Sequence, residues 1–321
     1  MKKFDVIALG ELLIDFIEHG TSSQGNPVFE ANPGGAPCNV LAMLNKLGKK
    51  TAFIGKVGND AFGHILKNVV EDIGTDVTNL FMDNDIHTTL AFVSKLPNGD
   101  RDFSFYRNPG ADMMLAKNEI DENFIKDAKI FHFGTLSSTH NSVREATRYA
   151  VELAKKHNLL ISFDPNLREP LWPSLQAAKN EIEYGLSKCD ILKISDNELE
   201  FMTGTDDYDK AARMLKDKYD ISIVFATLGK GGSRAYYKDI SLNADAFLQS
   251  ETIETTGAGD TFTGCILNFI LEHGIDNLND KIIHEALVFA NAAASIITTK
   301  KGALKVMPEK REIAELISKY I

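Results

Sequence analysis

Short apolar runs rich in β-branched residues alternate along most of the chain with longer amphipathic runs. This alternation predicts strands joined by helices, the pattern of a mostly parallel α/β sheet flanked by helices. The predicted strands span residues 5–9, 51–55, 129–133, 159–163, 191–194 and 221–227. The predicted helices span residues 37–47, 61–73, 142–157, 174–186, 196–202, 208–218, 260–273, 280–299 and 309–320.

Two polar, turn-rich segments interrupt this alternation, residues 11–33 and 76–110. The second alternates in polarity around a Pro97-Asn-Gly99 turn, which is typical of a β-hairpin. Both segments are expected to form antiparallel strands outside the parallel sheet, and to pair into a small lid sheet over one face of the main domain. No linker or internal repeat divides the chain, so residues 1–321 are expected to form a single domain.

The composition excludes several classes of function. The chain has 321 residues, of which 44% are hydrophobic, and a net charge of −10, so no global positive field attracts nucleic acid. Its three cysteines, Cys38, Cys189 and Cys265, lie far apart, which indicates free thiols in a reducing compartment. No apolar run approaches the ~20 residues of a membrane span. The sequence therefore predicts a cytoplasmic protein without nucleic-acid or membrane partners.

Common phosphate and hydrolase signatures are missing from the sequence. No GxxxxGK[ST] loop occurs, because Gly229-Lys230 is followed by Gly231, and neither GxGxxG nor GxSxG is present. The eight histidines have no HxxxH spacing, which favours structural or surface roles over metal binding. Any phosphate chemistry in this chain must therefore use a different cradle.

One candidate for that cradle is residues 254–264, a polar, glycine-rich turn that runs into an apolar helix. Gly257, Ala258 and Gly259 can aim backbone N–H groups at an anion, and the helix dipole favours negative charge there. Asp260 could accept a proton from a substrate hydroxyl beside that anion. The alternative is a well-formed helix N-terminus in which Asp260 interacts only with the dipole, and the segment alone does not decide between the two.

Other polar segments stand at predicted strand ends and loop–helix junctions. Gly34 and Gly35 allow close backbone approach, and the amide of Asn39 suits sugar hydroxyls. Asp164, Asn166 and Arg168 follow a predicted strand, at the edge where open parallel sheets bind ligands. For each segment an ordinary loop, with its polar side chains bonded locally, is an equal alternative.

Three further segments suit parts of a nucleotide or sugar. Asn197 and Glu200 share a helix face and could hold Mg²⁺ through water, although a capped acidic helix start is the simpler interpretation. The segment 227–232 could wall a nucleotide or form a plain glycine turn. Phe105 and Arg107 lie on the second interrupting segment, where they could cover a sugar or pack the small sheet.

Together and in this order, these segments resemble the ribokinase-like (PfkB) family of carbohydrate kinases. The resemblance spans the chain from Gly10-Glu-Leu-Leu-Ile-Asp15 to about residue 303, and its most specific marks are Gly34-Gly-Ala-Pro-Cys-Asn39 and Thr255-Thr-Gly-Ala-Gly-Asp260. Segments 106–112, 163–173 and 195–201 are similar to those of fructokinases. The resemblance implies a ribokinase-like fold with a β-sheet lid, ATP as donor, Mg²⁺, and a homodimer formed through the lids.

The resemblance also implies roles for individual residues. Asp260 would be the general base, and the N–H groups from Gly257 through Ala258 and Gly259 to Asp260 would bind the transferring phosphoryl group. The sugar-binding residues would be Asp15, Gly34, Gly35, Asn39, Phe105, Arg107, Asn166 and Arg168. The nucleotide-binding residues would be Lys193, Asn197, Glu200, Thr227, Gly229, Gly232 and Asn291, with Glu200 also holding Mg²⁺ through water.

One position departs from the family pattern. Glu254 stands six residues before Asp260, where the family usually has Asp at a site that helps bind a monovalent cation. The resemblance therefore implies a K⁺ site at Glu254 and Thr256 with an extra methylene. The activity implied is ATP-dependent phosphorylation of D-fructose to D-fructose 6-phosphate. The alternatives are another acceptor such as 2-keto-3-deoxygluconate, or a regulator that binds sugar and nucleotide without catalysis.

Overall fold

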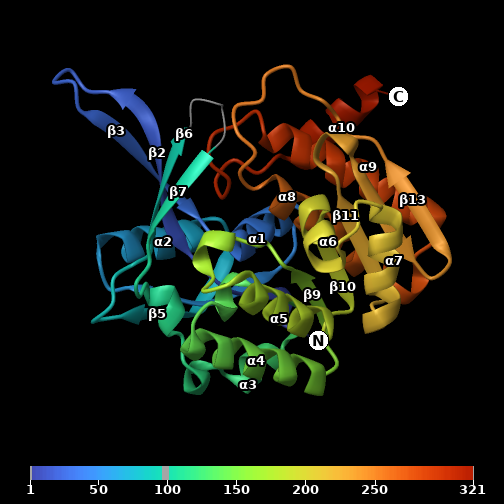
Figure 1. Cartoon of the computed structure of the whole chain (residues 1–321), viewed down its shortest axis with the longest axis horizontal. Coiled ribbons are helices and arrows are strands. Elements are labelled where there is room, and N and C mark those ends of the chain that lie inside the picture. Colours follow the sequence, from blue (N-terminus) through green and yellow to red (C-terminus); the bar gives the residue numbers. More distant parts are fainter. Residues whose placement is uncertain (1, 96–100, 321) are drawn as a thin grey trace.

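A computed structural model describes residues 2–95 and 101–320, which build two separate sheets (Figure 1). The larger sheet has nine strands in the order β13-β12-β11-β10-β9-β8-β1-β4-β5. Pairing is parallel from β5 to β11 and antiparallel around β12. The strands are β1 (Phe4–Leu9), β4 (Thr51–Gly58), β5 (Thr75–Asp83), β8 (Ala128–Gly134), β9 (Leu160–Asp164), β10 (Ile191–Ser195), β11 (Ile223–Thr227), β12 (Ser233–Tyr237) and β13 (Ile240–Ala244).

Helices cover both faces of this sheet because successive strand residues point to opposite sides. In β1, Val6 and Ala8 belong to one buried apolar cluster, whereas Ile7 and Leu9 belong to the other. The first cluster includes residues of α1 (Ala36–Lys46), α2 (Ala61–Asp72), α8 (Ala258–His273), α9 (Asp280–Ile297) and α10 (Lys310–Tyr320). The second includes residues of α3 (Glu122–Lys126), α4 (Asn141–Lys156), α5 (Leu175–Leu186), α6 (Asp196–Thr203) and α7 (Tyr208–Tyr219). Within the described residues, no helix is both long and apolar enough to span a bilayer.

The smaller sheet projects from one end of the molecule, and we call it the lid (Figure 1). It consists of β2 (Leu13–Thr21), β3 (Pro27–Gly34), β6 (Leu90–Lys95) and β7 (Arg101–Tyr106) in the order β3-β2-β6-β7. Its register separates two faces. One carries a cluster of rings in which Phe92 stacks on Phe16 at 4.9 Å between centroids and meets Phe29 and Tyr106 edge-on. The opposite face carries Asp15, Ile17, Val93 and Phe105, which line a cavity.

The predicted fold class is confirmed, with two corrections to the lid. Residues 75–83 pair parallel with β4 in the main sheet, because α2 returns the chain to that sheet as the crossover of a βαβ unit. Strands β2 and β6 also pair parallel rather than antiparallel. The antiparallel edge strands β12 and β13 extend the sheet beyond the predicted strands. The predicted turn at 97–99 lies outside the described residues.

The packing of α1 against α8 is unusually close at Gly264. A Cβ atom built at Gly264 would lie 2.7 Å from the Cβ of Met43 and 3.0 Å from the carbonyl oxygen of Val40. Both helices begin at the carboxyl edge of the sheet, so their spacing decides which side chains meet there. Gly264 therefore sets the distance between the two helices.

We predict that Gly264→Ala lowers the free energy of unfolding by about 1–3 kcal/mol, the usual cost of overpacking a core. Urea unfolding measures this change. In a Met43→Gly background, where the Cβ at position 43 is also removed, the same substitution should cost less. Equal costs in the two backgrounds would show that this contact does not limit the approach of α1 to α8.

Candidate active site

The N-terminus of α8 has the geometry of an anion site. Gly257 adopts a left-handed conformation with φ 76°, and a Cβ there would lie 2.7 Å from that of Ala303. Within the described part of the chain, the N–H groups of Gly257, Gly259 and Asp260 bond to no acceptor, whereas that of Ala258 bonds to the Thr255 carbonyl oxygen at 3.3 Å. In this conformation the turn before the helix uses the N–H of Ala258, and its expected role at a ligand stays a prediction.

Asp260 is held by Asn39, whose Nδ2 donates to Oδ2 of Asp260 at 2.8 Å. Burial raises the pKa of Asp260, while this hydrogen bond and the charges of Lys193 and Arg168 counteract the rise. The Oδ1 atom of Asn39 is buried without a hydrogen-bond partner among the described residues. A buried amide oxygen in that state is suited to accept a hydrogen bond from a ligand hydroxyl.

A buried lysine lies beside this helix start. Lys193, in the middle of β10, forms an ion pair with Asp164 at 3.1 Å between Nζ and Oδ2. A Cβ at Gly259 would lie 3.1 Å from the same Nζ, so the ammonium group sits against the backbone of the anion site. Burial alone would lower the pKa of Lys193, but the carboxylates of Asp164, Glu198 and Asp260 outweigh burial and raise it. Lys193 therefore keeps a positive charge next to the N-terminus of α8.

Two buried glutamates, Glu11 and Glu198, shape the walls of the site, and sequence patterns alone do not single them out. Glu11 Oε1 accepts the N–H of Ala36 at 2.9 Å, which fixes the turn entering α1, and burial raises the pKa of Glu11 to about 7. Glu198 accepts the N–H groups of Leu167 at 2.8 Å and Ser195 at 2.9 Å, which ties the loop after β9 to α6. Their position directly after strands at the carboxyl edge is the one signal that could have identified them.

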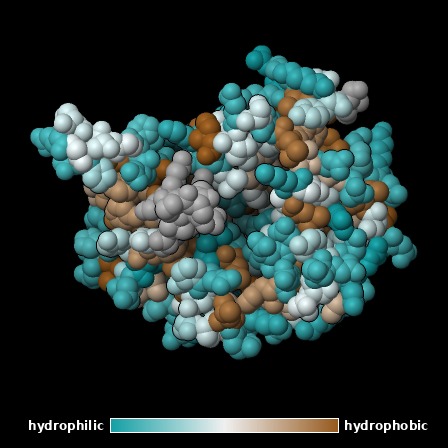
Figure 2. Space-filling view, turned by 45° about the horizontal axis from the view of Figure 1, so that its top comes forward, coloured by the Kyte–Doolittle hydropathy of each residue, from teal (hydrophilic) through white to brown (hydrophobic). Residues whose placement is uncertain are grey.

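These groups surround a cavity of about 600 Å³ between the lid and the main sheet. Figure 2 shows the face of the molecule hollowed between the lid, at the left, and the body. Leu13, Glu11, Leu136, Ser195, Glu198 and Phe201 are among its other lining residues. The predicted site residues that line it are Asp15, Gly35, Asn39, Phe105, Asn166, Arg168, Lys193, Asn197, Thr256, Gly257, Gly259 and Asp260.

Other predicted site residues lie outside this lining. Gly34 stands behind Asp15, and a Cβ there would lie 2.4 Å from Asp15 Oδ2, so Gly34 makes room for that carboxylate. Glu200 is exposed on α6, beyond Asn197. Asn291 donates to the carbonyl oxygens of Ala244 and Asp245 at 3.0 and 3.1 Å, and thereby holds the end of β13. Thr227, Gly229 and Gly232 lie at the end of β11 and in the turn to β12.

Arg107 differs most from its predicted place. Its guanidinium faces the protein interior, where Nε donates to Asp112 Oδ2 at 2.8 Å and one terminal nitrogen donates to Thr139 Oγ1 at 2.7 Å. Its side chain is 3% exposed. In this conformation Arg107 cannot reach a sugar or a phosphate, because Asp112, five residues along the chain, folds back and binds it.

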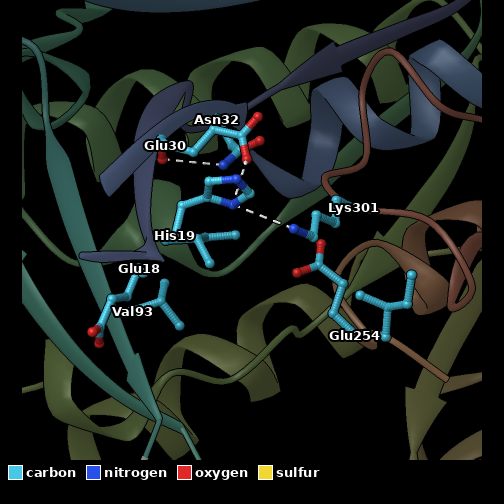
Figure 3. A pocket seen from close by; sticks show the side chains of 10 residues that line it. Glu18, His19, Glu30, Asn32, Val93, Glu254 and Lys301 are labelled. Atoms are coloured by element: carbon cyan, nitrogen blue, oxygen red, sulfur yellow. Dashed lines mark hydrogen bonds and ion pairs between the residues drawn. The ribbon is translucent and has the colours of Figure 1, made fainter. Parts of the chain in front are cut away.

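Glu254 lines a second cavity of about 330 Å³, which lies between the lid and the segments around residues 254 and 301 (Figure 3). The Glu254 carboxylate accepts the N–H of Gly302 at 2.6 Å. On the opposite wall, His19 of β2 is 3.3 Å from Lys301 Nζ and 3.9 Å from Glu30 Oε2. This cavity shares Ile17 and Val93 with the larger one, so the two adjoin beneath the lid.

The arrangement can bind an anion beside a buried base. The N–H groups that bond to no acceptor among the described residues, the helix dipole and the Lys193 charge all favour negative charge at one point, and Asp260 lies next to it. No cluster of three or more histidine, cysteine, aspartate or glutamate side chains suited to a metal ion occurs in the described residues. Asn197 and Glu200 offer oxygen donors three residues apart on α6, which fit a Mg²⁺ ion that keeps its water shell.

The chain matches the family described as pfkB family carbohydrate kinase over residues 3–310. The chain belongs to the pfkB family of carbohydrate kinases. It is 40% identical over 316 residues to Fructokinase-1 of Zea mays, covering 98% of both chains. Two solved structures of family members resemble the fold at 28% identity. The ATP-bound fructokinase of Xylella fastidiosa has a TM-score of 0.90 and covers 100% of this chain and 99% of its own. A double mutant of the Vibrio cholerae O395 fructokinase, in a fructose-, ADP- and potassium-ion-bound form, has a TM-score of 0.88 and covers 99% of both chains.

The burial of Asp260 in this pfkB-family chain predicts a raised pKa, which can be measured. Carboxyl NMR titration should place the pKa of Asp260 above 3.8, because burial disfavours the charge. Asn39→Ala removes a hydrogen bond to the charged form and should raise that pKa further. Asn123→Ala, at an exposed amide, serves as the control and should leave it unchanged. A pKa of Asp260 at or below 3.8, or one that Asn39→Ala leaves unmoved, would contradict this account of the site.

Proposed function

We propose that this protein transfers the γ-phosphoryl group of ATP to a hydroxyl of D-fructose, giving ADP and D-fructose 6-phosphate. The observation that carries the proposal is the buried Asp260, held by Asn39 and adjoining N–H groups at the start of α8 that bond to no acceptor among the described residues. The similarity to fructokinases over nearly the whole chain supports fructose as the acceptor. The two sheets act as one kinase domain in this proposal, with the lid covering the acceptor.

In the proposed reaction, Asp260 accepts the proton of the attacking hydroxyl and Asn39 keeps its carboxylate aimed at that proton. The raised pKa of Asp260 makes it a stronger base than an exposed aspartate. The N–H groups of Gly259 and Asp260 stabilise charge on the transferring group, and the left-handed turn at Gly257 aims them there. Positioning of the acceptor falls to the lining side chains Asp15, Phe105, Asn166 and Arg168, with Asn39 Oδ1 as a further acceptor.

The nucleotide occupies the remainder of the carboxyl edge in this proposal. Lys193 and Asn197 line the cavity on the side of β10 and α6, and Thr227, Gly229, Gly232 and Asn291 continue along the edge beyond them. Mg²⁺ held through water by Asn197 and Glu200 would neutralise phosphate charge. A K⁺ ion at Glu254 and Thr256 would steady the segment that precedes the anion site.

We further propose a homodimer formed through the outer face of the lid. Phe16, Phe29, Phe92 and Tyr106 cluster there, and Tyr106 is 66% exposed. An exposed aromatic that packs against a ring cluster is typical of a protein interface. Sedimentation of the wild type and Tyr106→Asp tests this, and an unchanged mass between them would contradict it.

An ADP-release assay over a panel of sugars tests the function. D-Fructose should give the highest kcat/KM, and 2-keto-3-deoxygluconate as the best acceptor would contradict that choice. Replacing potassium by sodium salts in the same assay tests the cation, since loss of activity is expected. Release of ADP with none of the sugars would overturn the kinase proposal.

Asp260→Asn tests the base in the same assay. We predict a fall in kcat by about 10²–10⁴-fold with KM for both substrates nearly unchanged, because the amide cannot accept the proton. The variant should unfold at or above the wild-type temperature, since it removes a buried charge. Turnover near that of the wild type would exclude Asp260 as the base.

A further inference from the structure

The start of β6 and the end of β7 are both anchored to one buried carboxylate, that of Asp112. Thr89 precedes β6 and Arg107 follows β7, so these two residues are the roots of that half of the lid (Figure 1). Thr89 Oγ1 donates to Oδ1 of Asp112, and Arg107 donates to Oδ2 of the same carboxylate, with Nη2 at 2.6 Å. The side chains of Arg107 and Asp112 are 3% and 2% exposed. Asp112 therefore joins both roots inside the protein.

The other side of the Arg107 guanidinium binds the wall of the cavity. One terminal nitrogen donates to Thr139 Oγ1 at 2.7 Å, and the other donates to the carbonyl oxygen of Leu136 at 3.1 Å. Leu136 lines the cavity and follows the carboxyl end of β8. A buried guanidinium bonded in this way has one orientation, because leaving any of these polar groups unpaired is costly.

The pairing of the lid strands connects Thr89 and Arg107 to residues that line the cavity. Ala91, two residues after Thr89, pairs with Phe105, two residues before Arg107. Ala91 also pairs with Asp15 of β2. Phe105 and Asp15 both line the cavity. A small rotation at the roots therefore moves both side chains relative to Asp260.

We propose that Arg107 is a positioning residue which, through Asp112, fixes the angle at which the lid leaves the body. The proposal rests on the kinase function proposed above, in which the lid covers the acceptor. Direct binding of the sugar by Arg107 is the competing role. It would require the guanidinium to leave Asp112, Thr139 and Leu136, and to expose the buried Asp112 carboxylate without a charged partner.

Hydrogen exchange of the unliganded protein tests, independently of activity, whether Arg107 and Asp112 fix the lid on the body. Arg107→Met and Asp112→Asn should each speed amide exchange in β2 and β6 by about tenfold or more, with β8 to β11 unchanged, because the lid alone is loosened. Thr89→Val removes one hydrogen bond and keeps the ion pair, so it should give a smaller change and still fold. Arg234→Met, on β12, breaks an exposed ion pair with Asp209 of α7 and is the control for a lost arginine. Lid exchange equal to that of the control in all three variants would overturn the proposal.

Kinetics then separate positioning from direct binding. Arg107→Met and Asp112→Asn should both raise the acceptor KM and lower kcat, by about 10²-fold in kcat/KM. Both should also increase ATP hydrolysis relative to sugar phosphorylation, because a misplaced lid admits water. The double variant should be little worse than either single variant.

A KM effect confined to Arg107→Met, with Asp112→Asn and Thr89→Val like the wild type, would assign Arg107 to sugar binding and overturn the proposal. A wild type inactive on every sugar would count against the kinase function. The exchange result would still decide whether Arg107 and Asp112 fix the angle of the lid.

Discussion

The hydrogen bond between Asn39 and Asp260 joins the starts of two helices that are 221 residues apart in sequence. It brings the first third of the chain, which carries the lid, to the last third, which carries the anion site. The close approach of α1 to α8 at Gly264 makes this bond possible, and Glu11 fixes the turn from which α1 starts. The remaining parts of the site, from Lys193 to Asn166, come from strands that end at the same edge of the sheet.

Electrostatics at this edge balance a group of buried carboxylates against few cations. Asp260, Asp164 and Glu198 all raise the pKa of Lys193, so the lysine stays charged although burial opposes it. Glu198 is bound to two backbone N–H groups, and Asp164 is paired with the lysine. Asp260 is the carboxylate that faces the unused N–H groups of α8. This distribution places N–H groups suited to bind an anion beside a buried carboxylate, which is the pairing that the proposed phosphoryl transfer to a hydroxyl requires.

Much of this arrangement could be predicted from sequence because it depends on local patterns. Long periodic segments predicted the strands and helices, and glycine turns running into helices predicted the starts of α1 and α8. The parts that could not be predicted depend on contacts between distant residues or on exact turns. Arg107 was expected to bind a sugar or pack the small sheet, and its ion pair with Asp112 depends on a short turn that the sequence pattern does not reveal. The bond of the Ala258 N–H to the Thr255 carbonyl oxygen likewise depends on an exact turn. Glu11 looked like an ordinary residue after a strand, and β5 was misassigned because the crossover through α2 was overlooked.

The central claim is that the N-terminus of α8 binds the transferring phosphoryl group. Calorimetry with ADP and fluoroaluminate in the presence of fructose tests it directly, since this pair mimics a phosphoryl group between donor and acceptor. The wild type should bind ADP with fluoroaluminate at least about 10²-fold more tightly than ADP alone. Gly257→Ala, which cannot keep the left-handed turn, should bind ADP normally and lose that gain. Equal gains in the two proteins would contradict the account.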